Sequence, residues 1–322
     1  MRRGIGIIGT GKHGSRYAEH LVRDLTDRAE LTAICRRSPA IGKEQADRWQ
    51  AAYHQDWRQL VADPRVEAVI SVTTPNLNPE IAACCLNHQK PLLIEKPLAV
   101  SVPVAQAMVA GFQAAGLPLT VAQTLRYNQV ILGLRREFPR IGELRCLSAT
   151  HQLEPSTLDW LTRPELAGGG VIFHTAVHVF DALRFITGQE IVRIQATARR
   201  VHNPNLEDLL AAQFELSGGA LGTLLAGKVG AARAGRYEFM GEAGQLQGDQ
   251  VHGQLELVQG AEVTAFKHER PGPTILPLLR DWLDYLAGLG ENPLPGQEGW
   301  AAVRVCAACD RAARTGGWVA CL

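Results

Sequence analysis

The sequence predicts an α/β protein of two domains, a parallel sheet covered by helices followed by an α/β domain with a large open, mostly antiparallel sheet. Over residues 4–121, short apolar runs alternate with helical segments, which is typical of a parallel sheet with both faces covered. After residue 122, longer segments alternate apolar and polar residues, as in an antiparallel sheet with one polar face. The length of 322 residues also fits two domains, which we place at 1–121 and 122–322.

Four helices and five strands are expected in the first domain. The strands are short apolar runs bounded by Gly, Pro or charged residues: Ile5–Ile8, Leu31–Cys35, Val66–Val72, Leu92–Ile94 and Leu119–Ala122. The helices are Ser15–Asp24, a segment that ends near Asp63-Pro64, Pro79–Asn87 and Val102–Ala115.

The second domain is expected to be mainly sheet. Its strands, separated by Gly, Pro and Asn, are Leu144–His151, Ile191–Val201, Leu209–Leu216, Ala220–Ala226, Tyr237–Met240, Leu246–Gln250, Leu255–Val258 and Glu262–Phe266. Its helices are Val171–Ile186, Ile275–Leu289 and one near Gly299–Arg314. The last helix contains Cys306-Ala-Ala-Cys309, which we interpret as two buried cysteines, since no second pair completes a zinc site.

The composition excludes several classes of protein. Hydrophobic residues make up 46% and charged residues 20%, the mix of a globular chain. Lys and Arg number 33 against 32 Asp and Glu, and this net charge of +1 gives no basic surface for nucleic acid or an anionic membrane. The seven cysteines form no disulfide framework, no run of about 20 apolar residues occurs, and glycines break the apolar run after Met1-Arg2-Arg3. We therefore expect a cytoplasmic protein with neither nucleic acid nor membrane as a partner.

The motif Gly9-Thr10-Gly11-Lys12-His13-Gly14 follows the first strand and opens the first helix. In this setting the first glycine allows a tight turn, the second lets the backbone approach a pyrophosphate, and the third lets the helix pack on the strand. The helix N-terminus then offers unpaired N–H groups to the anion. The motif predicts a Rossmann dinucleotide-binding domain, against the alternative of a structural glycine-rich turn.

The end of the second strand indicates which dinucleotide binds. An NAD enzyme usually places a carboxylate there for the ribose 2′-OH, but this strand ends in Arg36-Arg37-Ser38. Two guanidiniums and a hydroxyl suit a 2′-phosphate, which favours NADP over NAD. The alternative is that the arginines are solvated surface charges and that either cofactor is used.

Two further segments stand at the carboxyl ends of parallel strands, where an open α/β sheet binds ligands. Thr73-Thr74-Pro75-Asn76 follows the third strand, and Glu95-Lys96-Pro97 follows the fourth. We expect both segments to contact the cofactor, with Lys96 able to reach past it towards a substrate.

The chain resembles the Gfo/Idh/MocA family of oxidoreductases. The motifs that carry the resemblance are the N-terminal glycines, Ala62-Asp63-Pro64, Glu95-Lys96-Pro97, Gly168-Gly169-Gly170 leading to His178 and Asp181, Gly241-Glu242-Ala243-Gly244 and Thr315-Gly316. The resemblance implies a Rossmann domain, then a substrate-binding and oligomerisation domain whose outer sheet face commonly joins subunits, and so a homodimer or homotetramer. It also implies a catalytic role for Lys96 and an acid/base role for His178.

His174, His178 and Asp181 are spaced to share one face of an otherwise apolar helix. Such a stripe is either a site or a satisfied core network. The family that this chain resembles usually has an aspartate at the position of His174. A carboxylate accepts hydrogen bonds from substrate hydroxyls and supports a nearby positive charge, and a neutral imidazole does only part of this. Histidines four residues apart also chelate zinc, but Thr175 stands where a zinc protease needs glutamate, and we expect no metal.

We expect a small substrate, a sugar or polyol, to contact both the second domain's first segment and its main helix. The candidate substrate-binding residues are Arg126, Tyr127, Trp160, Arg163, His174 and Asp181. For Trp160 ordinary packing is the alternative. The expected reaction is hydride transfer between NADP(H) and a hydroxyl or carbonyl carbon, with Lys96, His178 and His174 as catalytic residues. The alternatives are an NAD-dependent glycoside hydrolase of the same fold and a non-catalytic dinucleotide sensor.

Overall fold

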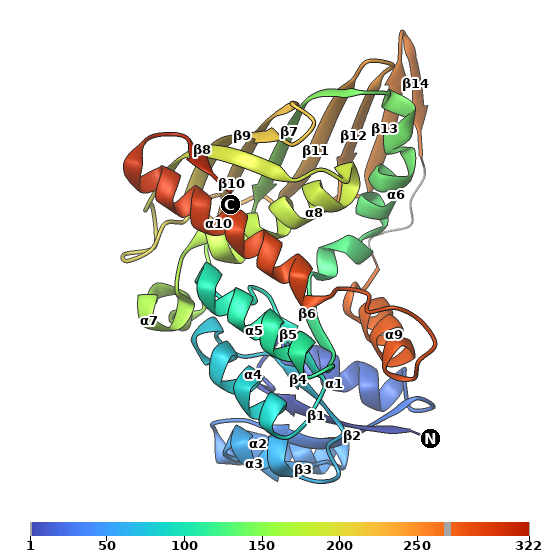
Figure 1. Ribbon diagram of the computed structural model, residues 1–322, viewed down its shortest axis with the longest axis vertical. Coiled ribbons are helices and arrows are strands. Elements are labelled where there is room, and N and C mark those ends of the chain that lie inside the picture. The colour runs from blue at the N-terminus through green and yellow to red at the C-terminus, as the bar shows by residue number, and fades with distance from the viewer. Residues whose placement is uncertain (1, 267–271, 322) are drawn as a thin grey trace. The chain divides into compact units, whose positions relative to one another are not determined.

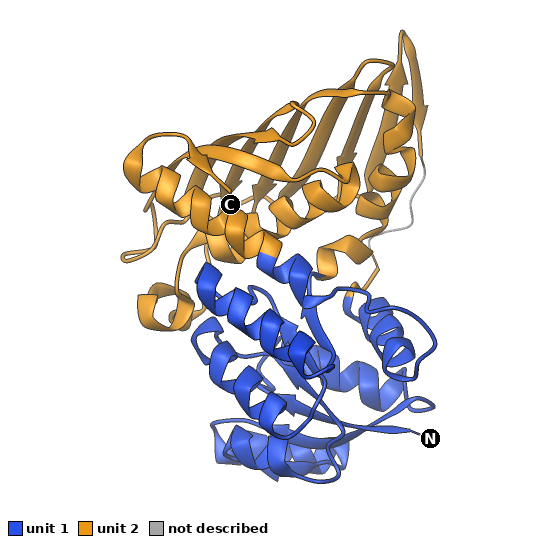
Figure 2. Ribbon diagram, viewed as in Figure 1, with its two compact units in different colours: residues 1–123, 275–300 blue, residues 124–274, 301–322 orange. Residues whose placement is uncertain are grey.

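The computed structural model describes residues 2–266 and 272–321, so that Met1 of the basic N-terminal segment lies outside the described residues. The chain forms two compact units (Figure 2). The first unit comprises residues 1–123 and 275–300, and the second comprises 124–274 and 301–322. The expected fold class is confirmed: a Rossmann unit with a parallel sheet, and a unit built on a mixed, mostly antiparallel sheet.

The first unit is a six-stranded parallel sheet in the order β3-β2-β1-β4-β5-β6. Its strands are β1 (Arg3–Ile8), β2 (Ala29–Cys35), β3 (Ala52–His54), β4 (Ala68–Ser71), β5 (Leu92–Glu95) and β6 (Leu119–Ala122). Its helices are α1 (Gly14–Arg23), α2 (Pro39–Trp49), α3 (Trp57–Ala62), η1 (Pro75–Leu77), α4 (Asn78–Asn87), α5 (Val102–Ala114) and α9 (Ile275–Leu286), and α4 and α5 pack side by side (Figure 1). The central strands are fully buried, as expected for a sheet covered on both faces.

Three elements of this unit were not predicted: α2, β3 and the short helical turn η1. The strand has only three residues, too few to show a period, and the helix begins at Pro39 directly after the strand-end arginines. The strands and helices predicted elsewhere in the unit are confirmed to within a few residues.

The first unit also contains a segment from late in the chain, which the single boundary at residue 121/122 did not predict. Strand β6 lies at the edge of the sheet, and the segment after α9 pairs with it. The N–H of Val121 donates to the carbonyl of Leu294 at 2.9 Å, and the Thr120 hydroxyl donates to Asn292 Oδ1 at 2.9 Å. Because these bonds satisfy the edge strand, residues 275–300 pack as part of the Rossmann unit.

The second unit is a nine-stranded sheet in the order β14-β13-β12-β11-β7-β10-β9-β8-β15. Its strands are β7 (Leu144–Gln152), β8 (Ile191–Arg199), β9 (Leu209–Leu216), β10 (Leu221–Gly227), β11 (Ala234–Gly241), β12 (Gln245–Asp249), β13 (Gln254–Gln259), β14 (Glu262–Ala265) and β15 (Val319–Ala320). Every recorded pairing is antiparallel except that of β7 with β10. The expected strands are confirmed, and the two-residue β15 was not predicted.

The helices of this unit are η2 (Thr124–Tyr127), α6 (Gln129–Glu137), η3 (Phe138–Ile141), η4 (Asp159–Thr162), α7 (Pro164–Ala167), η5 (Ile172–Ala176), α8 (Val177–Thr187) and, from residue 301, α10 (Gly296–Thr315). The longer ones, α6, α8 and α10, lie along one face of its sheet (Figure 1). Strand residues such as Phe214, Leu224 and Phe239 are buried on the covered face, while Leu221 and Met240 are exposed on the other. Cys306 and Cys309 are fully buried in α10, where they pack as core residues.

The predicted helix over residues 171–186 is present in two parts. Its first part, η5, is a π-helical turn, and α8 continues from Val177. The wider turn shifts the residues before it around the helix axis relative to those after it. By length and composition, Pro164–Thr187 passes as a membrane span, contrary to our expectation, but 78% of its most apolar window is buried inside the structure.

Candidate active site

The glycine turn has the form that a dinucleotide requires. Gly9 adopts a φ of 93°, and a Cβ added there would lie 2.2 Å from the carbonyl oxygen of Val72. A Cβ at Gly14 would lie 2.1 Å from the carbonyl oxygen of Gly9, whereas one at Gly11 would meet nothing within 4 Å. The first and third glycines are therefore fixed by the fold, and the second faces the open space that a pyrophosphate would fill.

A network of hydrogen-bonded side chains stabilises this turn. Thr10 is fully buried, and its hydroxyl donates to Gln45 Oε1 at 2.8 Å. The amide of Gln45 donates to the Thr10 carbonyl at 3.2 Å, and the Arg36 guanidinium donates to the same oxygen. Gln45 lies on the unpredicted α2, so that sequence reasoning missed it. Of the strand-end residues, Arg36 is thus bonded to the turn, Arg37 is exposed, and Ser38 stands at the N-cap position of α2 without a capping hydrogen bond from its side chain.

The loops after β4 and β5 meet at the carboxyl edge of the sheet, because these strands are neighbours. Asn78, only 2% exposed, donates to the carbonyls of Pro97 at 3.0 Å and Leu98 at 3.2 Å. It therefore fixes the segment that follows Lys96, which is half-buried. Asn78 was not predicted, although a polar residue two positions after the expected loop gave a signal. In that loop Thr73 and Thr74 are half-buried, and Asn76 is exposed.

Glu95 joins the glycine turn to the strand that carries Lys96. Its Oε1 accepts from His13 Nε2 at 2.7 Å and from the Tyr17 hydroxyl at 2.6 Å, and its Oε2 accepts from the Lys96 N–H at 3.1 Å. Burial by itself raises the pKa of this carboxyl, but the bond and charge of His13, with Lys96 and Tyr17, outweigh burial and hold the pKa below its usual value. Burial and the Glu95 charge raise the pKa of Tyr17 well above its usual value.

In the second unit, His174 and Trp160 contact each other. The two rings meet edge to face at 5.2 Å, and His174 Nε2 lies 3.0 Å from the Ala167 carbonyl, to which it donates. His174 is 8% exposed and lines a small pocket of about 80 Å³ together with Glu207 and Lys228. These contacts support the packing interpretation of Trp160.

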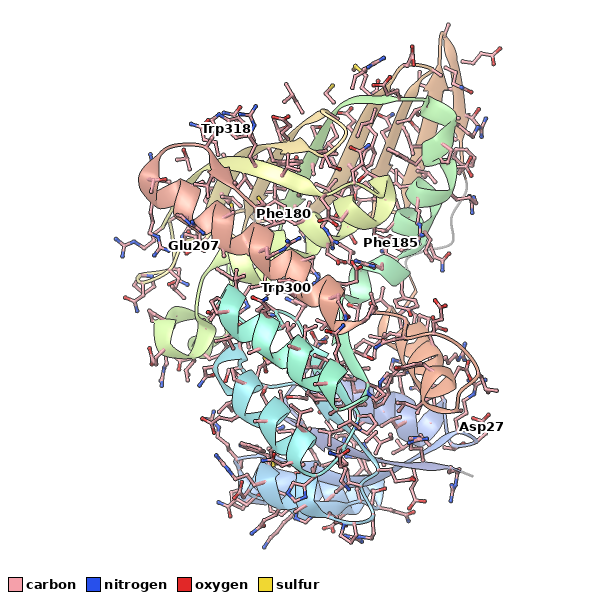
Figure 3. The ribbon with its side chains drawn as sticks, viewed as in Figure 1. Asp27, Phe180, Phe185, Glu207, Trp300 and Trp318 are labelled. Carbon is pink, nitrogen blue, oxygen red and sulfur yellow. The ribbon has the colours of Figure 1, made fainter. Side chains whose placement is uncertain are left out.

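Glu207, labelled in Figure 3, is a residue that sequence reasoning missed. Its Oε1 accepts from the N–H groups of Gly170 at 2.9 Å and Ile172 at 3.3 Å, at the start of the helix that carries the histidines. A Cβ at Gly170 would lie 1.9 Å from the Glu207 carbonyl oxygen. Burial raises the pKa of Glu207. Gly170, the last glycine of the triple-glycine motif, thus allows close approach of the Glu207 backbone, in the segment before β9.

Arg126 and Asp181, both predicted to bind substrate, form a bidentate ion pair. Arg126 Nε donates to one carboxylate oxygen at 2.9 Å and its terminal nitrogen donates to the other at 2.7 Å. Asp181 is fully buried, and the Arg126 guanidinium stacks 5.0 Å from the ring of Phe185. Asp181 therefore orients Arg126, which extends from η2 beside the half-buried Tyr127.

The other expected residues are distributed over both units. His178, on α8, is half-buried, and Lys96 belongs to the first unit. Arg163 is 54% exposed and pairs with Asp159 at 2.8 Å on the surface. Lys12 is exposed. Among the described residues, no group of three His, Cys, Asp or Glu side chains is placed to hold a metal ion.

We predict that Glu95→Gln destabilises the protein by about 2–4 kcal/mol at pH 7, because it removes a buried charge that accepts three hydrogen bonds. The folded-state pKa of Glu95 is depressed, so its contribution is present above the unfolded pKa and is lost as pH falls through the folded pKa. Urea unfolding of both proteins at pH 7, 5 and 4 should show the difference shrinking with acid. Glu137→Gln on α6, whose carboxyl also has a lowered pKa, is a positive control and should show a difference that shrinks with acid in the same way. A constant difference across pH would contradict the assignment.

Comparison with known proteins agrees with this geometry. Residues 3–123 match the family model described as oxidoreductase family, NAD-binding Rossmann fold, and residues 139–247 match the GFO/IDH/MocA C-terminal domain. A myo-inositol dehydrogenase of Streptomyces leeuwenhoekii is 26% identical over 97% of this chain and 98% of its own length. Inositol 2-dehydrogenase 2 of Saccharopolyspora erythraea is 27% identical over 98% and 94%.

Solved structures share the fold over the whole chain. Levoglucosan dehydrogenase in complex with NADH superposes with a TM-score of 0.91 at 19% identity, covering all of both chains. An oxidoreductase domain protein from Kribbella flavida superposes with a TM-score of 0.90 at 23% identity, also over all of both chains. Together the two family models match more than half of the sequence, and the chain therefore belongs to the Gfo/Idh/MocA family of NAD(P)-dependent oxidoreductases.

Proposed function

We propose that the protein catalyses reversible hydride transfer between NADP(H) and a CH–OH or carbonyl carbon of a sugar or polyol. The observation that carries the proposal is the Glu95 carboxylate, which ties the glycine turn to Lys96 at one edge of one parallel sheet. A dinucleotide on that turn would run along the edge where Lys96 stands. The relatives named for inositol and levoglucosan support a polyhydroxylated substrate.

The chain's own residues supply orientation and proton transfer. When bound, a dinucleotide would supply the hydride acceptor for oxidation of the substrate carbon and the hydride donor for its reduction. The Lys96 ammonium would donate to the reacting oxygen and stabilise negative charge on it. His178 would take the hydroxyl proton during oxidation and give it back during reduction. Arg126, fixed by Asp181, would hold substrate hydroxyls or a carboxylate, and His174 would act indirectly through Trp160 and the pocket wall.

The NADP preference rests on the residues after β2. No carboxylate follows Cys35 to accept from a ribose 2′-OH. Because Arg36 already donates to the Thr10 carbonyl, we assign the 2′-phosphate mainly to the exposed Arg37 and to Ser38. Levoglucosan dehydrogenase, of the same fold, was solved with NADH, so the fold by itself does not choose the cofactor.

Arg37→Ala should weaken NADP binding by about 10–100-fold, the loss of one charge-assisted contact, and change NAD binding by less than about twofold. Calorimetric titration of NAD and NADP measures both affinities. Arg48→Ala, at the far end of α2, is the control and should leave the ratio unchanged. A wild-type protein that binds NAD more tightly than NADP would refute the preference.

Lys96→Met should lower kcat for sugar or polyol oxidation by at least about 1,000-fold and leave dinucleotide affinity within about twofold. The matched control is Lys90→Met. Lys90 lies before the amino end of β5, and its ammonium donates to the backbone carbonyls of Asp63 and Val66. That control should cost stability without changing kcat. Normal turnover by the Lys96 variant would end the proposal, and wild-type dinucleotide binding without turnover of any sugar or polyol would favour the sensor alternative.

We also propose that the protein is a cytoplasmic homo-oligomer joined through the open face of the second unit's sheet. Exposed Leu221 and Met240 flank Cys146 in strand register, and a shallow depression of about 430 Å³ extends from them to Trp318. A second copy would cover these apolar side chains. All seven cysteines are free thiols, which a reducing cytoplasm maintains.

Leu221→Arg should convert the oligomer to monomers, because it places a charge at the centre of the buried face. Light scattering coupled to size exclusion measures the mass. Leu289→Arg, which changes a leucine that is 76% exposed in the first unit, should leave the mass unchanged. A wild-type chain that elutes as a monomer of 35.0 kDa would contradict the interface.

A further inference from the structure

Gln123 is an unexplained polar residue in the first unit. It follows β6 directly and is only 1% exposed. Neither its Oε1 nor its Nε2 reaches solvent, and neither has a hydrogen-bond partner among residues 2–266 and 272–321. Such a carboxamide destabilises the folded state, because a buried donor or acceptor without a partner loses its hydrogen bonds to water and gains none in the protein. A leucine would occupy the same volume without that cost.

The position of Gln123 indicates what the amide is for. In the β5–β6 pair, Ala122 lies opposite Glu95, so that Gln123 stands level with Lys96 at the carboxyl edge. The strand order reverses between β1 and β4, and an open α/β sheet binds a dinucleotide across such a point. A dinucleotide with its pyrophosphate at Gly11 and its adenosine ribose near Arg37 would place its nicotinamide half towards the ends of β4, β5 and β6.

The chemistry of the Gln123 side chain indicates which kind of chemical group it can bind. A carboxamide presents one donor group and one acceptor side by side in a plane. Its complement is a second planar amide, which satisfies both atoms at once, whereas a substrate hydroxyl occupies one position. The nicotinamide ring carries such an amide. Because neither atom reaches solvent, the Gln123 side chain has to rotate towards the ring. The two hydrogen bonds that it then forms with the nicotinamide amide offset the free-energy cost of this rotation.

We propose that Gln123 is a cofactor-binding residue that pairs with the carboxamide of the nicotinamide ring. Its Oε1 accepts from the nicotinamide amino group, and its Nε2 donates to the nicotinamide carbonyl. The pair fixes the rotation of the ring and therefore which face is presented to the substrate. This assignment rests on the proposed dinucleotide-dependent function. It adds a residue that binds the nicotinamide half of the cofactor.

The first experiment compares whole and truncated cofactor. Gln123→Leu should bind the preferred dinucleotide about tenfold more weakly, and ADP-ribose or its 2′-phosphate, which lack nicotinamide, within about twofold. Equal loss or no loss for both ligands would overturn the assignment. A wild-type protein that binds neither ligand would instead refute the proposed function, so the two failures are distinguishable.

The second experiment changes the ligand and needs no variant to fold. The acetylpyridine analogue of the dinucleotide carries a methyl group in place of the amino group. The wild-type protein should bind it about tenfold more weakly than the natural dinucleotide, and Gln123→Leu should bind the two alike. Equal wild-type affinity for both would overturn the pairing.

Stability gives an independent readout. Gln123→Leu removes an unpaired buried amide and should raise the midpoint of thermal unfolding by about 2 °C while it weakens cofactor binding. The matched control is Tyr237→Phe in the second unit, where a buried hydroxyl also has no partner among the described residues. It should raise the midpoint without changing the ratio of dinucleotide to ADP-ribose affinity. A lowered midpoint with unchanged binding in Gln123→Leu would show that the amide serves the fold.

Discussion

The arrangement of the Rossmann unit depends on one buried carboxylate. Glu95 ends β5, and its two oxygens accept from His13 in the glycine turn, from Tyr17 on α1 and from the backbone of Lys96. A charge in this position is tolerable only because every bond is made at once. The same atoms therefore hold the glycine turn, the first helix and the backbone of Lys96 in one geometry. Movement of any of the three costs the charge a partner.

A second polar layer supports the loops around that carboxylate. Gln45 and Arg36 converge on the Thr10 carbonyl, and Asn78 holds the two carbonyls that follow Lys96. These side chains are bonded to the protein itself and so are fixed in place. The residues that remain for ligands are those with open space or exposed donors, such as Gly11 and Arg37. Rigid support beneath a few accessible groups is what preorganisation requires.

The sequence was sufficient to predict the fold class because its periods are strong: short apolar runs in the first unit and alternating strands in the second. The form of the glycine turn and the place of Lys96 directly after β5 were predictable, because both depend on residues close by in the sequence. Gln45, Asn78 and Glu207 were not, since their roles come from partners 19 to 37 residues away in the chain. The π-helical turn over residues 172–176, which contains His174, also could not be predicted from the spacing.

The pairing of Leu294 with Val121 bears on how this protein could be divided. A fragment that stops at residue 123 would retain every nucleotide-facing loop but would present β6 as a bare sheet edge. Unprotected edges recruit other chains, so this fragment would precipitate or swap strands. A self-standing nucleotide module would need residues 275–300 joined to its end by a linker. Gene fusion or domain exchange in this chain therefore has to carry two separate stretches of sequence together.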